Sequence, residues 1–212
     1  MNDFLFFEIT YKLSEILKIV STKNQGGVFP YSTVISALLG VSVGFFMNFF
    51  KEKYTERKKR KKYLECIRWE VLQCQDIAKH LFTFTLHSYT DFKKGNDSII
   101  RSGDTFPVHC FDKFYPEVIS ILESDKREAL CMMQANIPFI EDFNKDIHLP
   151  FTEYQRLETP ILCEKLFTIM VRSARIYQAC RLYLGEISYD EMTNSNVKTI
   201  ALHFGLDTSY IR

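Results

Sequence analysis

The stretch that decides the fold is VFPYSTVISALLGVSVGFFMNFF, residues 28–50. Its 23 residues carry no charge, and at about 1.5 Å per residue a helix of this length crosses a hydrocarbon core of roughly 30 Å. The next twelve residues, KEKYTERKKRKK at 51–62, hold eight Lys or Arg and two Glu. Because basic residues beside a span stay on the cytoplasmic side, we expect a membrane anchor whose C-terminal side is cytoplasmic.

The rest of the chain is long enough for one helical domain. About 150 of the 212 residues follow the anchor, which suffices for an ordinary core. With 8 Gly and 6 Pro, long helices are favoured over a turn-rich β fold. We therefore expect an all-α chain in which one transmembrane helix continues into a cytoplasmic bundle. The predicted parts are an N-terminal amphipathic segment, the span, a polybasic segment and the cytoplasmic helical domain, at 1–27, 28–50, 51–62 and 63–212.

The N-terminal segment has one apolar face. In DFLFFEITYKLSEILKIVS, residues 3–21, apolar residues recur at spacings of three and four, but four charged residues lie between them: Glu8, Lys12, Glu15 and Lys18. The segment is too polar to span a membrane. Two alternatives stay open: it lies in the outer membrane interface, or it packs against neighbouring helices of an oligomer.

Small or polar residues recur every four positions along the predicted span. They are Ser32, Ser36, Gly40, Gly44 and Asn48. Small residues let helix backbones approach each other in lipid, and an asparagine finds its hydrogen-bond partner across such an interface. The pattern predicts a face that packs between subunits or lines a pore. The alternative is chance, because Gly and Ser are common in membrane helices.

The span ends in four phenylalanines: Phe45, Phe46, Phe49 and Phe50. In a pore these side chains would form a hydrophobic constriction, which gates by dewetting. The small and polar residues of the span fit simple self-association without further assumptions. A conducting pore requires in addition that the same face lines an open path.

The polybasic segment is a candidate lipid or phosphate contact. Its basic residues are Lys51, Lys53, Arg57, Lys58, Lys59, Arg60, Lys61 and Lys62. Each Lys or Arg near anionic headgroups contributes about 1 kcal/mol to membrane binding. Nucleic-acid phosphates are the competing partner. Since the whole chain has a net charge of only +1, the positive charge is local to this segment.

The span lacks a helix-stopping signal at its C-terminal end. No Gly or Pro occurs between Phe45 and Lys94, so we expect one helix from about Tyr31 to Phe92, ended by the Gly95 region. Heptad spacing joins Leu64, Ile67, Val71, Cys74, Ala78 and Leu81. This stripe fits either a coiled-coil seam or the first core helix of a bundle, and we favour the bundle.

Three later helices are predicted from start and stop signals. One resumes at Pro116; a second follows the capping-box pair Asp125 and Glu128, with a kink or division at Pro138; a third runs from Thr159–Pro160 to Gly185. The core face of the third helix reads Ile161, Leu162, Leu166, Ile169, Met170, Ser173, Ile176, Tyr177, Cys180 and Leu184.

The six cysteines predict no disulfide framework. They are Cys66, Cys74, Cys110, Cys131, Cys163 and Cys180, scattered without a CxxC pair. In a cytoplasmic domain we expect six reduced and mostly buried thiols.

No motif in the sequence indicates a catalytic site. His80 and His87 lie seven apart without a third metal ligand, and neither a phosphate-binding glycine loop nor a GxSxG or HExxH motif occurs. We therefore predict no enzyme, catalytic residue, metal or cofactor. Arg172 and Arg175, one turn apart, are candidate ligand contacts, although pairing with an acidic helix is the commoner role of such residues.

Two resemblances follow from these motifs. VKTIALHFGLDTSYIR, residues 197–212, resembles the first helix and turn of an AraC-type helix-turn-helix, but the recognition helix does not continue, so we interpret it as a short terminal helix stopped by Gly205. From Ile35 to about Leu81, the glycine-bearing span (LLGVSVGFF), basic exit (ERKKRKK) and following helix (LECIRWEVLQ) resemble small single-span bacterial membrane proteins. Similar architectures include the anti-phage effectors known as the Cas13b-associated pore protein and the Hailong membrane effector.

This second resemblance implies a homo-oligomeric effector of the bacterial inner membrane, with its N-terminus outside and its C-terminal domain cytoplasmic. Such effectors form or gate a pore and depolarise the membrane during anti-phage defence. The implied partners are other copies of the chain, anionic lipid, and a nucleotide, nucleic-acid or protein ligand of the cytoplasmic domain. The alternative is a membrane-tethered interaction module that conducts nothing.

Overall fold

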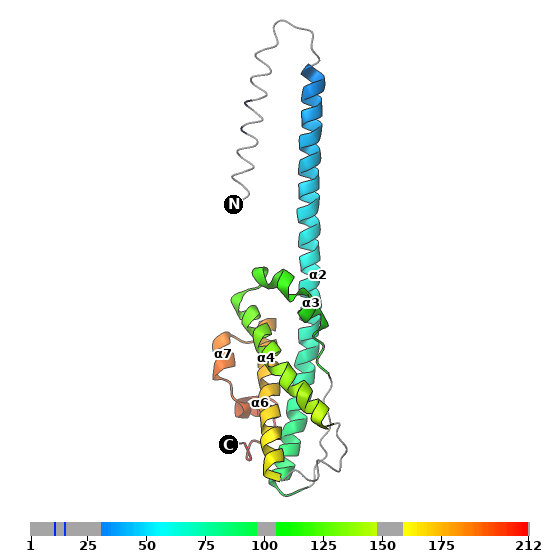
Figure 1. Cartoon of the computed structure of the whole chain (residues 1–212). Helices are drawn as coiled ribbons and strands as arrows, with labels where there is room; N and C mark the ends of the chain where they lie inside the picture. The colour runs from blue at the N-terminus through cyan, green and yellow to red at the C-terminus, as the bar shows by residue number, and fades with distance from the viewer. Residues whose placement is uncertain (1–10, 12–14, 16–30, 97–104, 148–158, 212) are drawn as a thin grey trace. The chain divides into compact units, whose positions relative to one another are not determined.

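The described residues of the computed structural model are all-α, as predicted. They are residues 11, 15, 31–96, 105–147 and 159–211, of which 31–37, 144–147 and 159–160 are described by their backbone only. The helices are α2 (Tyr31–Lys93), α3 (His109–Val118), α4 (Ser124–Ile147), α6 (Thr159–Leu184), α7 (Tyr189–Asn194) and α8 (Val197–His203), with the 3-10 helix η1 at Ile119–Ile121 (Figure 1). No strand occurs among these residues.

The chain divides into two compact units, Met1–Arg57 and Lys58–Arg212. Nearly all of the predicted amphipathic segment 3–21, and residues 28–30 of the predicted span, lie outside the described residues. Within the described part of the chain, no helix has both the length and the apolar character needed to cross a membrane.

The predicted length of the first long helix is confirmed. Helix α2 runs from Tyr31 to Lys93, and no Gly or Pro interrupts it beyond Phe45. Gly95, with φ of 77°, ends it. The N–H of Asn96 donates to the carbonyl of Asp91 over 2.9 Å, which satisfies one of the last carbonyls of the helix.

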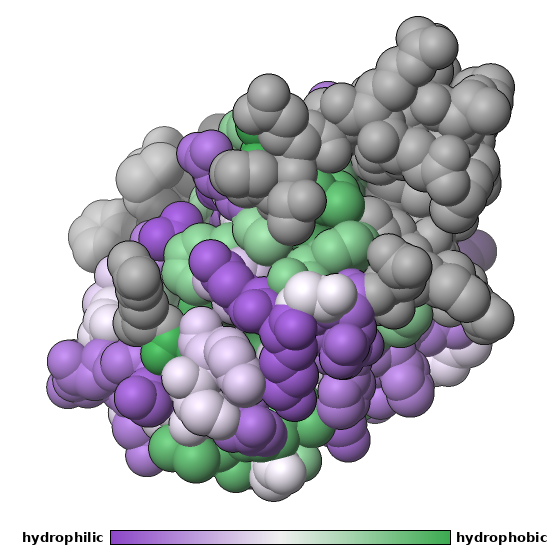
Figure 2. All heavy atoms as spheres, turned by 90° about the horizontal axis from the view of Figure 1, so that it is seen from below, coloured by the Kyte–Doolittle hydropathy of each residue, from purple (hydrophilic) through white to green (hydrophobic). Residues whose placement is uncertain are grey.

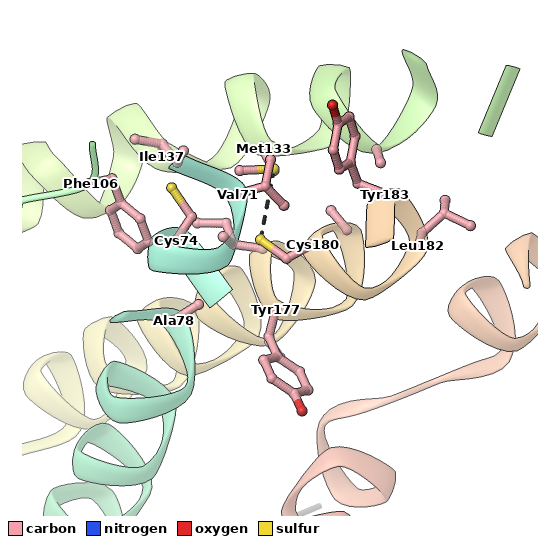
Figure 3. Packing of buried hydrophobic residues seen from close by; sticks show 14 of the residues in the cluster. Val71, Cys74, Ala78, Phe106, Met133, Ile137, Tyr177, Cys180, Leu182 and Tyr183 are labelled. Atoms are coloured by element: carbon pink, nitrogen blue, oxygen red, sulfur yellow. Dashed lines mark hydrogen bonds between the residues drawn. The ribbon is translucent and has the colours of Figure 1, made fainter. Parts of the chain in front are cut away.

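The heptad stripe of α2 lies in the core of the second unit. Ile67, Val71, Cys74 and Ala78 are at most 1 % exposed and belong to one apolar cluster with residues of α4 and α6. Figure 3 shows Val71 and Cys74 between these helices, next to Met133 and Cys180. The apolar stripe therefore belongs to the first core helix of a bundle, which is the alternative that we favoured. Because these residues are already buried within one chain, they cannot form a coiled-coil seam between chains.

Helices α4 and α6 lie side by side (Figure 1). The predicted bounds of α6 are confirmed, and Gly185, with φ of 76°, ends it. Its predicted core face is buried except at its ends. Ile161 is 44 % exposed and Leu184 is half-buried, so including Ile161 in the core was wrong.

The predictions from two prolines have different outcomes. Pro138 does not divide α4, which is helical from Ser124 to Ile147, while the alternative of a kink there stays a prediction. The helix predicted to resume at Pro116 begins instead at His109, and Pro116 lies inside α3. The reason is an acceptor from α2: the Glu70 carboxylate takes the first N–H groups of α3, as described below. A helix start supplied by a distant residue leaves no signal in the local sequence.

The C-terminal residues form two short helices, each with a side-chain cap. Ser188 and Glu191 form a reciprocal capping box on α7, and Asn196 accepts from the N–H of Thr199 at the start of α8. Gly205, with φ of 69°, follows α8. The interpretation as a short terminal helix is confirmed for the described residues 197–211.

The surface of the second unit is mixed in character. In Figure 2, hydrophilic residues surround separate hydrophobic groups on the face that is shown. This is the ordinary surface of a folded helical domain.

Candidate functional site

In the first unit, the described side chains of α2 expose large apolar groups on every side. Between residues 38 and 50, Val41 is 72 % exposed, Phe45 66 % and Met47 69 %. No side chain in this stretch is charged. A contiguous apolar surface of this kind is normally covered by lipid or by another protein.

The glycines of the predicted packing face are open. A Cβ atom added at Gly40 or Gly44 would meet no atom within 4 Å, and Asn48 is exposed. Among the described residues, therefore, nothing packs on this face. Ser32 and Ser36 are helical, but their side chains lie outside the description.

The four phenylalanines stand in two edge-to-face pairs. The ring centroids of Phe45 and Phe46 are 6.3 Å apart, and those of Phe49 and Phe50 are 6.1 Å apart. Nζ of Lys53 lies 4.9 Å from the centroid of Phe49. Their role as a gate stays a prediction.

The polybasic segment is largely exposed, and one of its lysines has a structural role. Nζ of Lys59 lies 3.6 Å from the Glu117 carboxylate and 5.4 Å from the centroid of Tyr63. A hydrogen bond with Tyr63 and the charge of Glu117 raise the pKa of Lys59. The Tyr63 ring stacks on Phe114, with centroids 4.0 Å apart. Lys59 and Tyr63 thus help to attach α3 to α2.

A second attachment between α2 and α3 is the most specific polar arrangement of the second unit. The Glu70 carboxylate, 5 % exposed, accepts from the N–H groups of Cys110 and Phe111 at 2.6 and 2.8 Å. One turn later on α2, Sγ of Cys74 donates to the carbonyl of Pro107 over 3.6 Å. A buried carboxylate at the first N–H groups of a helix is stabilised by both hydrogen bonds and the helix dipole.

One turn earlier on α2, Cys66 forms a disulfide with Cys110, with their Cα atoms 6.0 Å apart. The expectation of six reduced thiols was therefore wrong. We name Cys66, Glu70 and Cys74, together with the segment 107–111 that they hold, the α2–α3 clamp. The sequence carried a faint signal: these three residues are spaced by four beside the apolar stripe.

The other four cysteines carry free thiols. Cys74, Cys163 and Cys180 are buried, and Cys131 is exposed. Burial, and secondly the charge of Glu70, raises the pKa of Cys74 to about 12. Burial, and then Cys74, raises the pKa of Cys180 well above its ordinary value. Sγ of Cys180 lies 3.8 Å from Sδ of Met133 (Figure 3).

The two candidate ligand contacts on α6 have different surroundings. Nη1 of Arg172 donates to Oδ1 of Asn136 over 2.9 Å, and its guanidinium lies 4.3 Å from the centroid of Phe139. Arg175 is exposed and, together with Gln178, lines a cavity of about 230 Å³. Arg172 thus joins α6 to α4, and the ligand role of both residues stays a prediction.

The described residues contain no cluster of potential metal ligands. His80 and His87 are both exposed on α2. No group of three or more His, Cys, Asp or Glu side chains in the described ranges is placed to hold a metal ion.

No protein-family model, no curated protein and no solved structure matches this chain.

Proposed function

We propose that the chain is a homo-oligomeric effector of the bacterial inner membrane that forms or gates a pore, under the control of its cytoplasmic domain, residues 63–212. The observation that supports it best is the uncharged stretch 28–50, whose described large side chains are exposed and which is followed by the polybasic segment. An uncharged apolar helix is stable in the interior of a membrane, and a polybasic segment is stable at its anionic surface.

Self-association is supported by the open glycine face. A glycine inside a helix costs about 1 kcal/mol relative to alanine, so two glycines one turn apart need a compensating contact. No described residue fills the space over Gly40 and Gly44, and a second helix of the same kind would fill it. In the assembled ring this face packs between subunits or lines the pore, and the phenylalanines after it form the gate.

The second candidate function is a non-conducting tether that recruits a cytoplasmic partner. The exposed apolar stretch and the polybasic segment support an anchor in either case. The two functions differ in whether the glycine face is needed.

The test is the membrane potential of bacteria that express the protein, measured with a voltage-sensitive dye. We expect depolarisation by the wild type and none by Gly40→Leu/Gly44→Leu at equal membrane abundance. Ser42→Leu is the control, because at about 100° per residue Ser42 lies on the opposite side of the helix. It should depolarise like the wild type.

Cross-linking of the same membranes separates the two candidates. A double variant that loses both its cross-linked oligomers and depolarisation supports the pore. Unchanged depolarisation in the double variant would refute a pore built on this face. If no variant depolarises the membrane under any condition, phage infection included, the tether is the better description.

A further inference from the structure

A cavity of the second unit lies between α2, α6 and the segment from η1 to α4. Its volume is about 420 Å³, within the range of roughly 300–1,000 Å³ that is typical of small-molecule sites. Leu64, Leu122 and Leu184 form an apolar wall. None of the residues discussed as candidate ligand contacts on α6 lines this cavity.

Two cations of α2 line the cavity and have no ion-pair partner in the described part of the chain. Lys61 and Arg68 line it, and seven residues of separation place them two turns apart on one face of the helix. Neither forms an ion pair with any residue that the structure describes. A third cation, Lys126, is already paired with Glu123 at 2.8 Å. Glu65 also lines the cavity, so the lining carries one net positive charge.

A tyrosine hydroxyl completes the site. Tyr183 lines the cavity and is 5 % exposed as a residue, but its hydroxyl oxygen is itself accessible and makes no hydrogen bond to a described residue. Figure 3 shows its ring rising from α6 toward α4. Burial raises the pKa of Tyr183, so the phenol keeps its proton and can donate it in a hydrogen bond. Because this hydroxyl is accessible at the cavity wall, a bound molecule can accept its hydrogen bond.

We propose that this cavity binds a small organic monophosphate, such as a nucleotide. Lys61 and Arg68 bind the phosphate, and the Tyr183 hydroxyl donates to one of its oxygens. The organic part packs on the wall formed by Leu64, Leu122 and Leu184, and the Glu65 carboxylate accepts from a hydroxyl or amine of the ligand. Because the site joins α2 to α4 and α6, an occupied cavity holds the three helices in one arrangement.

Binding is measured directly, without any conductance, so the result does not depend on the proposed pore. The full chain in detergent micelles is titrated with AMP by calorimetry, and adenosine and inorganic phosphate are titrated separately. We expect AMP to bind more tightly than either half. Lys61→Gln/Arg68→Gln and Tyr183→Phe should each weaken it, the double variant by about tenfold or more because two charge-assisted contacts are lost.

The matched control is Lys58→Gln/Lys62→Gln, which removes two charges from the same helix but from residues outside the cavity lining. It should bind AMP like the wild type. The phosphate that binds in the cavity could also come from a lipid headgroup. Binding of the same variants to vesicles that contain phosphatidylglycerol tests this alternative. A loss of vesicle binding that is confined to the cavity variants would assign the phosphate to lipid. If the cavity and control variants behave alike with both AMP and vesicles, the proposal is wrong.

Discussion

The buried carboxylate of the α2–α3 clamp allows a quantitative test of how α3 is held. Glu70→Gln keeps the size of the side chain and removes its charge. Only one of the two amide positions can accept, so one of the two bonds to the N–H groups of Cys110 and Phe111, at 2.6 and 2.8 Å, is lost. A hydrogen bond to a charged group contributes about 1.5–3 kcal/mol, and a buried N–H without a partner costs about 1–3 kcal/mol.

Together these effects predict that Glu70→Gln lowers the free energy of unfolding by about 3 kcal/mol. For a domain of roughly 150 residues this corresponds to a fall in Tm of about 6–12 °C. Urea unfolding of the full chain in detergent, followed by circular dichroism, measures the difference. Hydrogen exchange should also rise in residues 109–118, which form α3.

Glu65→Gln is the control for this experiment. It makes the same chemical change five residues earlier on α2, at an exposed side chain, and should alter stability by no more than about 0.5 kcal/mol. If Glu70→Gln unfolds within that margin of Glu65→Gln, the two hydrogen bonds do not hold α3 and our account of the clamp is refuted.

Three further predictions concern the cysteines. The Cys66–Cys110 disulfide has a sequence separation of 44 residues; by chain entropy, closing a loop of this size contributes about 4 kcal/mol. Reduction, or Cys66→Ser/Cys110→Ser, should therefore lower the urea midpoint, and an unchanged midpoint on reduction would contradict the bond. Among the four free cysteines, iodoacetamide at pH 8.5 should label Cys131 in the folded protein and spare the others, as read by mass spectrometry. Because burial raises the pKa of Cys74 to about 12, its thiol favours the folded state below its unfolded pKa, and this stability is lost as the pH rises from about 9 toward 12. Cys74→Ala should flatten this alkaline loss; an equally steep loss would assign it to other groups, such as Cys180.

Local signals were enough to predict the long helices. Helix α2 has no Gly or Pro between Phe45 and Lys94, and α6 has a proline in its first turn and Gly185 after its last. Both sets of bounds follow from backbone geometry alone. The buried stripe from Ile67 to Ala78 follows equally from periodicity, since three- and four-residue spacings place those side chains on one face.

The clamp and the cavity could not be predicted in this way. Cys66 and Cys110 meet because α3 lies along α2 in one register, set by Glu70 and by the stacking of Tyr63 on Phe114. That register depends on contacts between residues about 40 to 50 positions apart, which no local pattern encodes. The helix start predicted at Pro116 was wrong for the same reason. Proline suits the first turn of a helix, but Glu70 of α2 stabilises an earlier start of α3, at His109.

The two faces of α2 in the second unit explain how one helix can serve both stability and binding. Glu70 and Cys74 hold α3, and their polar atoms are fully used inside the protein. Lys61 and Arg68 have no ion-pair partner among the described residues, and they line a cavity whose remaining residues come from η1, α4 and α6. A carboxylate with both oxygens satisfied by backbone is a structural element, whereas the two cations beside an apolar wall and the Tyr183 hydroxyl suit the anionic ligand proposed above. That contrast is the reason to look for a ligand at Lys61 and Arg68 before the arginines of α6, where Arg172 already has its partner in Asn136.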